Sequence, residues 1–122
     1  MSTETTITVR WASPGFHLWP DADNATNGRR AYLGNRHRHL FYYEVTVGVD
    51  HQDREIEFHD LLDLGREFTG RRLDHEARSC EMLAAEVLDH LQTNLAVVSN
   101  RNRSCSVWED NEVGATVTRN VK

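Results

Sequence analysis

The segment His39–Val47 alternates between two sets of side chains, and this pattern constrains the fold more than any other in the 122-residue sequence. Strict alternation is typical of a β-strand with one buried face. One face would carry His39, Phe41, Tyr43, Val45 and Val47, and the other Leu40, Tyr42, Glu44 and Thr46. Continuing the phase backwards puts His37 beside His39 and puts Arg36 and Arg38 on the opposite face. The strand is therefore expected to begin with two histidines on its apolar side and to end near Val49.

The His37/His39 pair is the first candidate for a functional site. Two imidazoles two residues apart on a strand lie about 7 Å apart along the chain, close enough to converge on one metal ion. Surface histidine pairs are also common, so the pair by itself leaves a metal site and a polar strand end both open.

Three more strands and two helices are expected around this strand. The strands span Thr6–Ala12, Cys105–Glu109 and Val113–Val117, and the helices run from Asp60 to Gly70 and from Ser79 to Asn94. Pro14-Gly15 should interrupt the first strand, Asp21–Gly34 should be a loop, and Ile56–Phe58 a short extended piece. Asp60 and Ser79 are the expected helix caps. The order β-β-α-α-β-β predicts an α+β domain, a four-stranded antiparallel sheet with two helices on one face.

Composition excludes several classes of protein. The length and the 39% hydrophobic and 27% charged residues predict a single domain over residues 1–122. No apolar run approaches the ~20 residues of a membrane span, and the N-terminus lacks the pattern of a secretory signal, so we expect a cytoplasmic protein without membrane association. A net charge of −5 argues against nucleic-acid binding. Cys80 and Cys105 form no CxxC motif and are expected to be free thiols.

Six short motifs follow one another between about residue 7 and residue 117. They are His17-Leu18-Trp19-Pro20, His37-Arg38-His39, Glu57-Phe58-His59-Asp60-Leu61, Leu73-Asp74-His75, Ser79-Cys80-Glu81 and Trp108-Glu109-Asp110. In this order and at about these spacings they resemble the family of 6-pyruvoyl-tetrahydropterin synthase and 6-carboxytetrahydropterin synthase. The resemblance implies the tunnelling (T-) fold of that family.

The resemblance also implies roles for individual residues. His17, His37 and His39 would bind one Zn²⁺ and leave its fourth position open for substrate or water. Asp74 would orient His75 for proton transfer. The reaction would be a lyase-type cleavage of the side chain of dihydroneopterin triphosphate or a related pterin. Family members most often form hexamers of two stacked rings, with active sites at the subunit interfaces.

Glu109 is notable without the resemblance. It shares a strand face with Cys105 and Val107, where burial of an unpaired carboxylate is costly. A pterin offers two parallel donors, N3–H and the 2-amino group, which suit one carboxylate. Alternatively, Glu109 turns to solvent at the strand end. The proton-transfer role of Asp74 also has an alternative, in which Asp74 only caps the turn that follows it in the chain.

Two departures bear on the chemistry. The family's catalytic cysteine would fall in the window Ala31–Leu33, which contains no cysteine, and Arg38 replaces the glycine between the two histidines. Cys80 is either a relocated thiol or, as we favour, packed under its helix. Three hypotheses result: a zinc-dependent pterin lyase, a zinc- and pterin-binding protein without turnover, and a protein sharing only the fold. The pathway, queuosine-type deazapurine or tetrahydrobiopterin-like, stays open.

Overall fold

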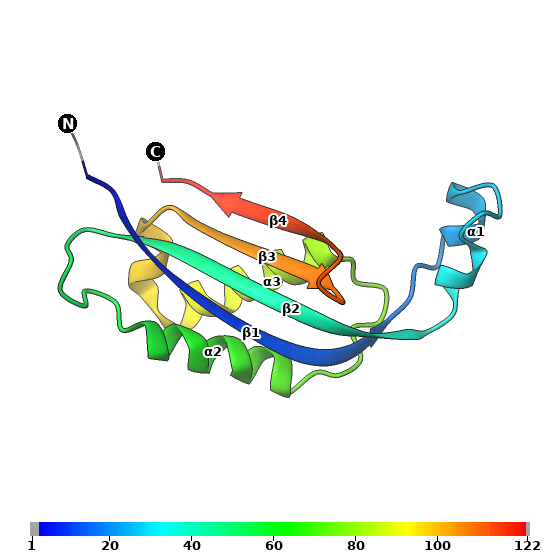
Figure 1. Cartoon of the computed structure of the whole chain (residues 1–122), viewed down its shortest axis with the longest axis horizontal. Coiled ribbons are helices and arrows are strands. Elements are labelled where there is room, and N and C mark those ends of the chain that lie inside the picture. The colour runs from blue at the N-terminus through cyan, green and yellow to red at the C-terminus, as the bar shows by residue number, and fades with distance from the viewer. Residues whose placement is uncertain (1–2, 122) are drawn as a thin grey trace.

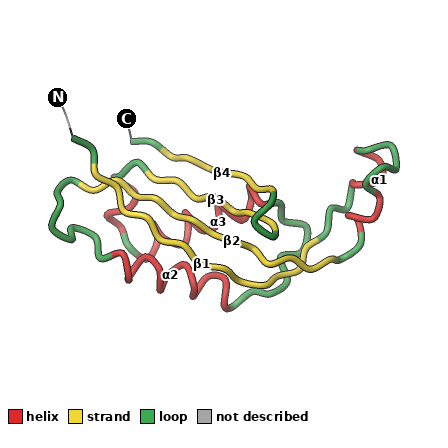
Figure 2. The backbone as a smooth tube through the Cα atoms, viewed as in Figure 1, coloured by secondary structure: helices red, strands yellow, loops and turns green. Residues whose placement is uncertain are grey.

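The computed structural model of the protein describes residues 3–121. It shows a four-stranded antiparallel sheet with helices against one face (Figures 1 and 2). The strands are β1 (Thr5–His17), β2 (His37–Val49), β3 (Arg103–Glu109) and β4 (Val113–Arg119), and they lie in the order β1-β2-β3-β4. The helices α2 (Phe58–Gly70) and α3 (Cys80–Asn94) pack against the sheet. Short helical segments are α1 (Ala22–Ala25), η1 (Ala31–Gly34) and η2 (Ala96–Asn100). The predicted α+β class and β-β-α-α-β-β order are confirmed.

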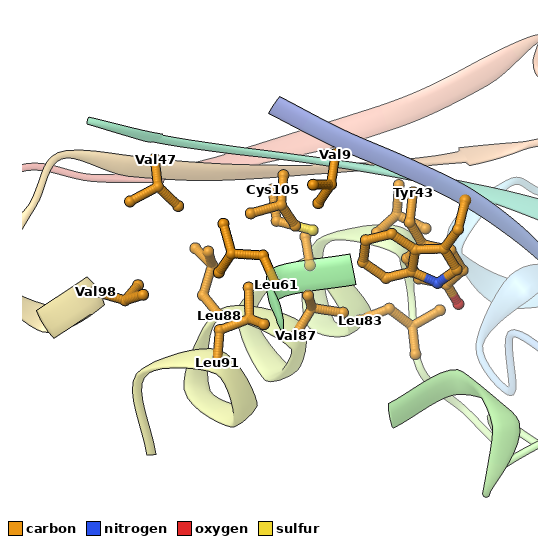
Figure 3. Close-up of a cluster of buried hydrophobic side chains, with 14 of the residues drawn as sticks. Val9, Tyr43, Val47, Leu61, Leu83, Val87, Leu88, Leu91, Val98 and Cys105 are labelled. Atoms are coloured by element: carbon orange, nitrogen blue, oxygen red, sulfur yellow. The ribbon is translucent and has the colours of Figure 1, made fainter. Parts of the chain in front are cut away.

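The core lies between the sheet and the helix pair (Figure 3). The predicted apolar face of β2 is confirmed, because Phe41, Tyr43, Val45 and Val47 are all at most 1% exposed. The stripe of α3 that faces them consists of Leu83, Ala84, Val87, Leu88 and Leu91, all fully buried. Burying one such large side chain contributes roughly 1.5–3 kcal/mol, so this interface holds the helices to the sheet.

Pro14-Gly15 does not interrupt the first strand, contrary to the prediction. β1 continues to His17, and Pro14 pairs with Leu40 while Gly15 pairs with His39. β1 is an edge strand with β2 as its single neighbour in the sheet, and proline is tolerated on edge strands because half of their N–H groups need no partner. The longer strand brings His17 opposite His37.

The start of α2 is also corrected. Asp60 is not its cap; the helix begins two residues earlier at Phe58, and the side chain of Glu57 accepts a hydrogen bond from the backbone N–H of His59 at 3.1 Å. No strand forms at Ile56–Phe58. The predicted cap of α3 is confirmed, since Ser79 Oγ accepts from the backbone N–H of Met82 at 3.2 Å.

Several elements begin or end at one end of the sheet. β1 and β3 finish there, β2 and β4 begin there, and α3 starts on the same side, while the segment carrying α1 and η1 projects beyond it (Figure 1). This segment was expected to be a loop and contains only these two short helical turns. Among the described residues, no helix has the length and apolar character needed to span a membrane.

Candidate metal centre and pocket

Three histidines meet at this end of the sheet. His17 ends β1, and His37 and His39 open β2. One ring nitrogen from each lies within 4.8 Å of those of the other two, and the ring centroids are 4.5 to 5.1 Å apart. The arrangement follows from the strands: His37 and His39 share a face, and the β1–β2 register places His17 opposite His37.

Each imidazole is held through its Nδ1 atom. Nδ1 of His17 lies 3.0 Å from the carbonyl oxygen of Arg78, and Nδ1 of His37 lies 2.8 Å from that of Asn35. Nδ1 of His39 lies 2.7 Å from Asp110 Oδ2. Carbonyl and carboxylate oxygens only accept hydrogen bonds, so each Nδ1 carries a proton, and Nε2 is the nitrogen through which each neutral ring would bind a metal.

The buried Nε2 of His39 has no hydrogen-bond partner among the described residues. An unpaired buried polar atom is costly, and a metal ion would satisfy it. Three neutral imidazoles with fixed Nδ1–H donors are a donor set that suits Zn²⁺ and leaves a fourth position open. The residues present therefore fit a metal ion of this kind.

Glu109, at the end of β3, lies beside the three histidines. Its Oε2 is 3.1 Å from His17 Nε2, and its Oε1 is 3.6 Å from His39 Nε2. Burial acts to lower the pKa of His17, but hydrogen bonds to Glu109 and to the Arg78 carbonyl outweigh it and raise that pKa. The hydrogen bond from His17 lowers the pKa of Glu109, so the carboxylate is ionised at neutral pH.

A pocket of about 500 Å³ opens in front of these groups, within the roughly 300–1,000 Å³ usual for small-molecule sites. Its polar lining includes His17, His37 and Glu109. Its walls come from the start of α3, from the edge of β4 and from the segment after β1, with Met82, Val113, Trp19 and Leu33 as apolar contacts. The exposed fractions of Val113 and Met82, 61% and 56%, leave an apolar rim at the mouth.

Asp74 and His75 do not line this pocket. Asp74 is exposed, and its carboxylate accepts from the backbone N–H of Glu76 at 3.0 Å and lies 3.4 Å from Arg36 Nε. His75 is only 1% exposed and packs edge-on against Phe41. Its Nδ1 has no partner among the described residues, so within one protomer the Asp74 carboxylate is not hydrogen-bonded to the His75 ring.

Cys80, the first residue of α3, is buried at the pocket wall. Its Sγ donates a weak hydrogen bond to Glu109 Oε2 at 3.8 Å. Burial, with the nearby Glu109 carboxylate, raises the pKa of the thiol to about 12. The Cys80 side chain is therefore a neutral thiol. Its burial agrees with the expectation that it packs under its helix.

Sequence reasoning did not find the partners that hold the three histidines. Arg78 and Asn35 act through backbone carbonyls, which no residue type reveals. Asp110 was named only as part of the motif Trp108-Glu109-Asp110 and was given no role of its own. Its contact with His39 depends on the β2–β3 register, in which Phe41 pairs with Glu109.

No protein-family model matches the sequence, and a comparison with curated proteins gives no match. Solved structures do match. A catalytic-residue variant of the Plasmodium vivax 6-pyruvoyltetrahydropterin synthase, with a glutamate replaced by alanine, has a TM-score of 0.73 at 17% identity, over 98% of this chain and 100% of that chain. The Plasmodium falciparum synthase gives 0.72 at 14% identity, over 98% and 100%. The Caenorhabditis elegans synthase gives 0.67 at 13%, over 98% and 99%. At these identities the matches show that the chain has the fold of these synthases.

Proposed function

We propose that this protein is a zinc-dependent lyase that processes a dihydropterin, dihydroneopterin triphosphate or a close relative. The observation that carries the proposal is the convergence of His17, His37 and His39, with each Nδ1 held by an oxygen acceptor, beside a pocket lined by two of them and by an ionised carboxylate. The fold shared with the pterin synthases adds support.

Zinc bound by the three histidines would polarise the hydroxyl oxygens of the substrate side chain and make an adjacent C–H more acidic. The remaining roles belong to the chain. Glu109 would accept the N3–H and 2-amino donors of the pterin ring, since an ionised carboxylate offers two parallel acceptors. Use of the histidine Nε2 atoms by a metal would release Glu109 from its contacts with His17 and His39.

Asp74 and His75 are proposed as the proton-transfer pair. Neither lines the pocket of its own protomer, so this role requires an active site shared between subunits and a rearrangement that exposes the His75 ring, which is 1% exposed in the protomer. β1 and β4 each have an unpaired edge, and open edges are usually covered or paired. We therefore propose a homo-oligomer, expected to be a hexamer. Light scattering that shows only the 14.1 kDa protomer at micromolar concentration would contradict the shared site.

The alternative function is zinc and pterin binding without turnover. It is favoured by the absence of cysteine at Ala31–Leu33 and by the raised pKa of Cys80, which leaves no thiolate in the pocket. Loss of a general base typically costs 10²–10⁴-fold in rate, while binding through Glu109 and zinc would survive.

The test combines metal analysis, binding and turnover on one preparation. Protein purified without chelators should contain about one zinc per protomer and should bind dihydroneopterin triphosphate in calorimetric titration. Cleavage of the side chain of the pterin substrate distinguishes the lyase from the binding protein. Protein with neither zinc nor pterin affinity would share only the fold.

Glu109→Gln refines the assignment because it keeps the shape of the side chain and removes its charge. If Glu109 is the pterin acceptor, the variant should keep its zinc and lose pterin affinity by at least tenfold. Loss of zinc as well would instead make Glu109 a metal ligand. The matched control is Glu112→Gln, which changes an exposed carboxylate three residues further along the same turn.

A further inference from the structure

Of the three Nδ1 atoms in the histidine cluster, that of His39 is the one held by a charged group. Asp110 Oδ2 lies 2.7 Å from His39 Nδ1, whereas His17 and His37 are held by neutral backbone carbonyls. A carboxylate partner orients a metal-binding imidazole, selects its tautomer and makes its free nitrogen more basic. His39 is also the ring whose Nε2 is buried without a partner among residues 3–121.

Asp110 is itself held firmly against β2. Its backbone N–H donates to the carbonyl oxygen of Leu40 at 2.8 Å, and its Oδ1 accepts from the backbone N–H of Leu40 at 2.9 Å. The two carboxylate oxygens thus have separate tasks, with Oδ1 on the strand and Oδ2 on His39. The residue sits in the left-handed region at φ 52°, where asparagine and aspartate are the best tolerated non-glycine residues.

We propose that Asp110 is a positioning residue that fixes His39 as the Nδ1–H tautomer, with Nε2 directed to the metal. The inference rests on the proposed zinc site and adds to it a residue outside the three ligands. Asp110 is not a member of the three-histidine cluster; it acts through the His39 ring.

Asp110→Asn is the decisive variant. It can replace the hydrogen-bond acceptor that faces His39 Nδ1 with a donor, and it keeps the backbone conformation. Asparagine tolerates the φ of 52°, and its single side-chain oxygen can still accept the hydrogen bond from the backbone N–H of Leu40. The amide NH₂ then faces His39 Nδ1 and can only donate. This favours the tautomer with the proton on Nε2, which cannot bind a metal.

The first readout is zinc affinity, measured by competition with a chromophoric chelator. Loss of a partner of this kind typically weakens metal binding by roughly 10–100-fold, and we expect that range for Asp110→Asn. Glu112→Gln is the matched control, because it makes the same charge change two residues away at an exposed side chain. It should bind zinc as the wild type does.

The second readout needs no metal. Proton–nitrogen NMR of metal-free protein should show His39 protonated on Nδ1 in the wild type and on Nε2 in Asp110→Asn. Equal zinc affinity in both proteins would overturn the inference. So would weaker affinity with an unchanged tautomer, since that result would mean a general structural effect. Wild-type protein that takes up no zinc would instead defeat the proposed function, and the metal-free spectra would still decide whether Asp110 sets the tautomer.

Discussion

The His75 ring lies directly against the backbone of Gly15. A Cβ atom added at Gly15 would come within 2.6 Å of His75 Nε2 and 3.1 Å of Phe41 Cδ2. Glycine is needed here for close approach rather than for an unusual backbone angle. The backbone N–H of His75 also donates to the carbonyl oxygen of Phe16 at 2.7 Å, so β1 holds the segment Leu73–His75 by both packing and hydrogen bonding.

Gly15→Ala should therefore destabilise the protein. Over-packing of a filled site costs typically 1–3 kcal/mol, and thermal unfolding should begin several degrees below the wild type. Gly70→Ala is the control, because a Cβ there meets nothing within 4 Å and alanine favours the helix. An unchanged melting temperature for Gly15→Ala would show that the His75 ring moves aside freely.

Stability should fall in mildly acidic solution because of His75. Burial lowers its pKa from 6.5 to about 4, so between these values the unfolded chain binds a proton that the native protein does not. The contribution of neutral His75 to the free energy of unfolding is complete above pH 6.5 and is lost as the pH falls to about 4. It amounts to about 3 kcal/mol.

The measurement is urea unfolding of metal-free protein at a series of pH values. His17, with its raised pKa, contributes in the opposite sense, since its stabilisation is lost as pH rises. Comparison with His75→Gln cancels that contribution. The difference in unfolding free energy between the two proteins should shrink from pH 7 to pH 4, and parallel curves would contradict the assignment.

Cys80 should react slowly with thiol reagents in the native protein. With its pKa raised to about 12, almost none of it is thiolate near neutral pH, and the thiolate is the reactive form. Alkylation by iodoacetamide, followed by mass spectrometry in a Cys105→Ala background, should be at least 100-fold slower in native than in urea-unfolded protein. Rapid native alkylation would instead support a relocated catalytic thiol.

Zinc occupancy should depend on the three histidines and on pH. His37→Ala or His39→Ala should remove the metal and leave a folded protein, because both side chains lie at the strand end outside the main core. Metal binding requires neutral imidazoles, so occupancy measured by elemental analysis after dialysis should fall below pH ~6. A variant that keeps full occupancy would exclude the mutated histidine as a ligand.

Much of the fold could be predicted from periodicity. The alternation in His39–Val47 predicted which face of β2 is buried, and its phase placed His37 beside His39. The apolar spacing and the Ser79 cap predicted α3 with its correct ends. The continuation of β1 through Pro14-Gly15 could not be predicted in this way, because it depends on β1 lying at an edge of the sheet.

Within the candidate site, the sequence by itself determined the local relationships: two histidines on one strand face, a carboxylate ending an apolar face, and a serine-capped helix. Backbone geometry imposes these relationships within each segment, through repeats of 2 and 3.6 residues. Only the tertiary structure decided that His17 lies opposite His37, that Asp110 reaches His39, and that His75 is buried away from the pocket. Those contacts join residues far apart in the chain, and they depend on strand register and side-chain packing that no local repeat encodes.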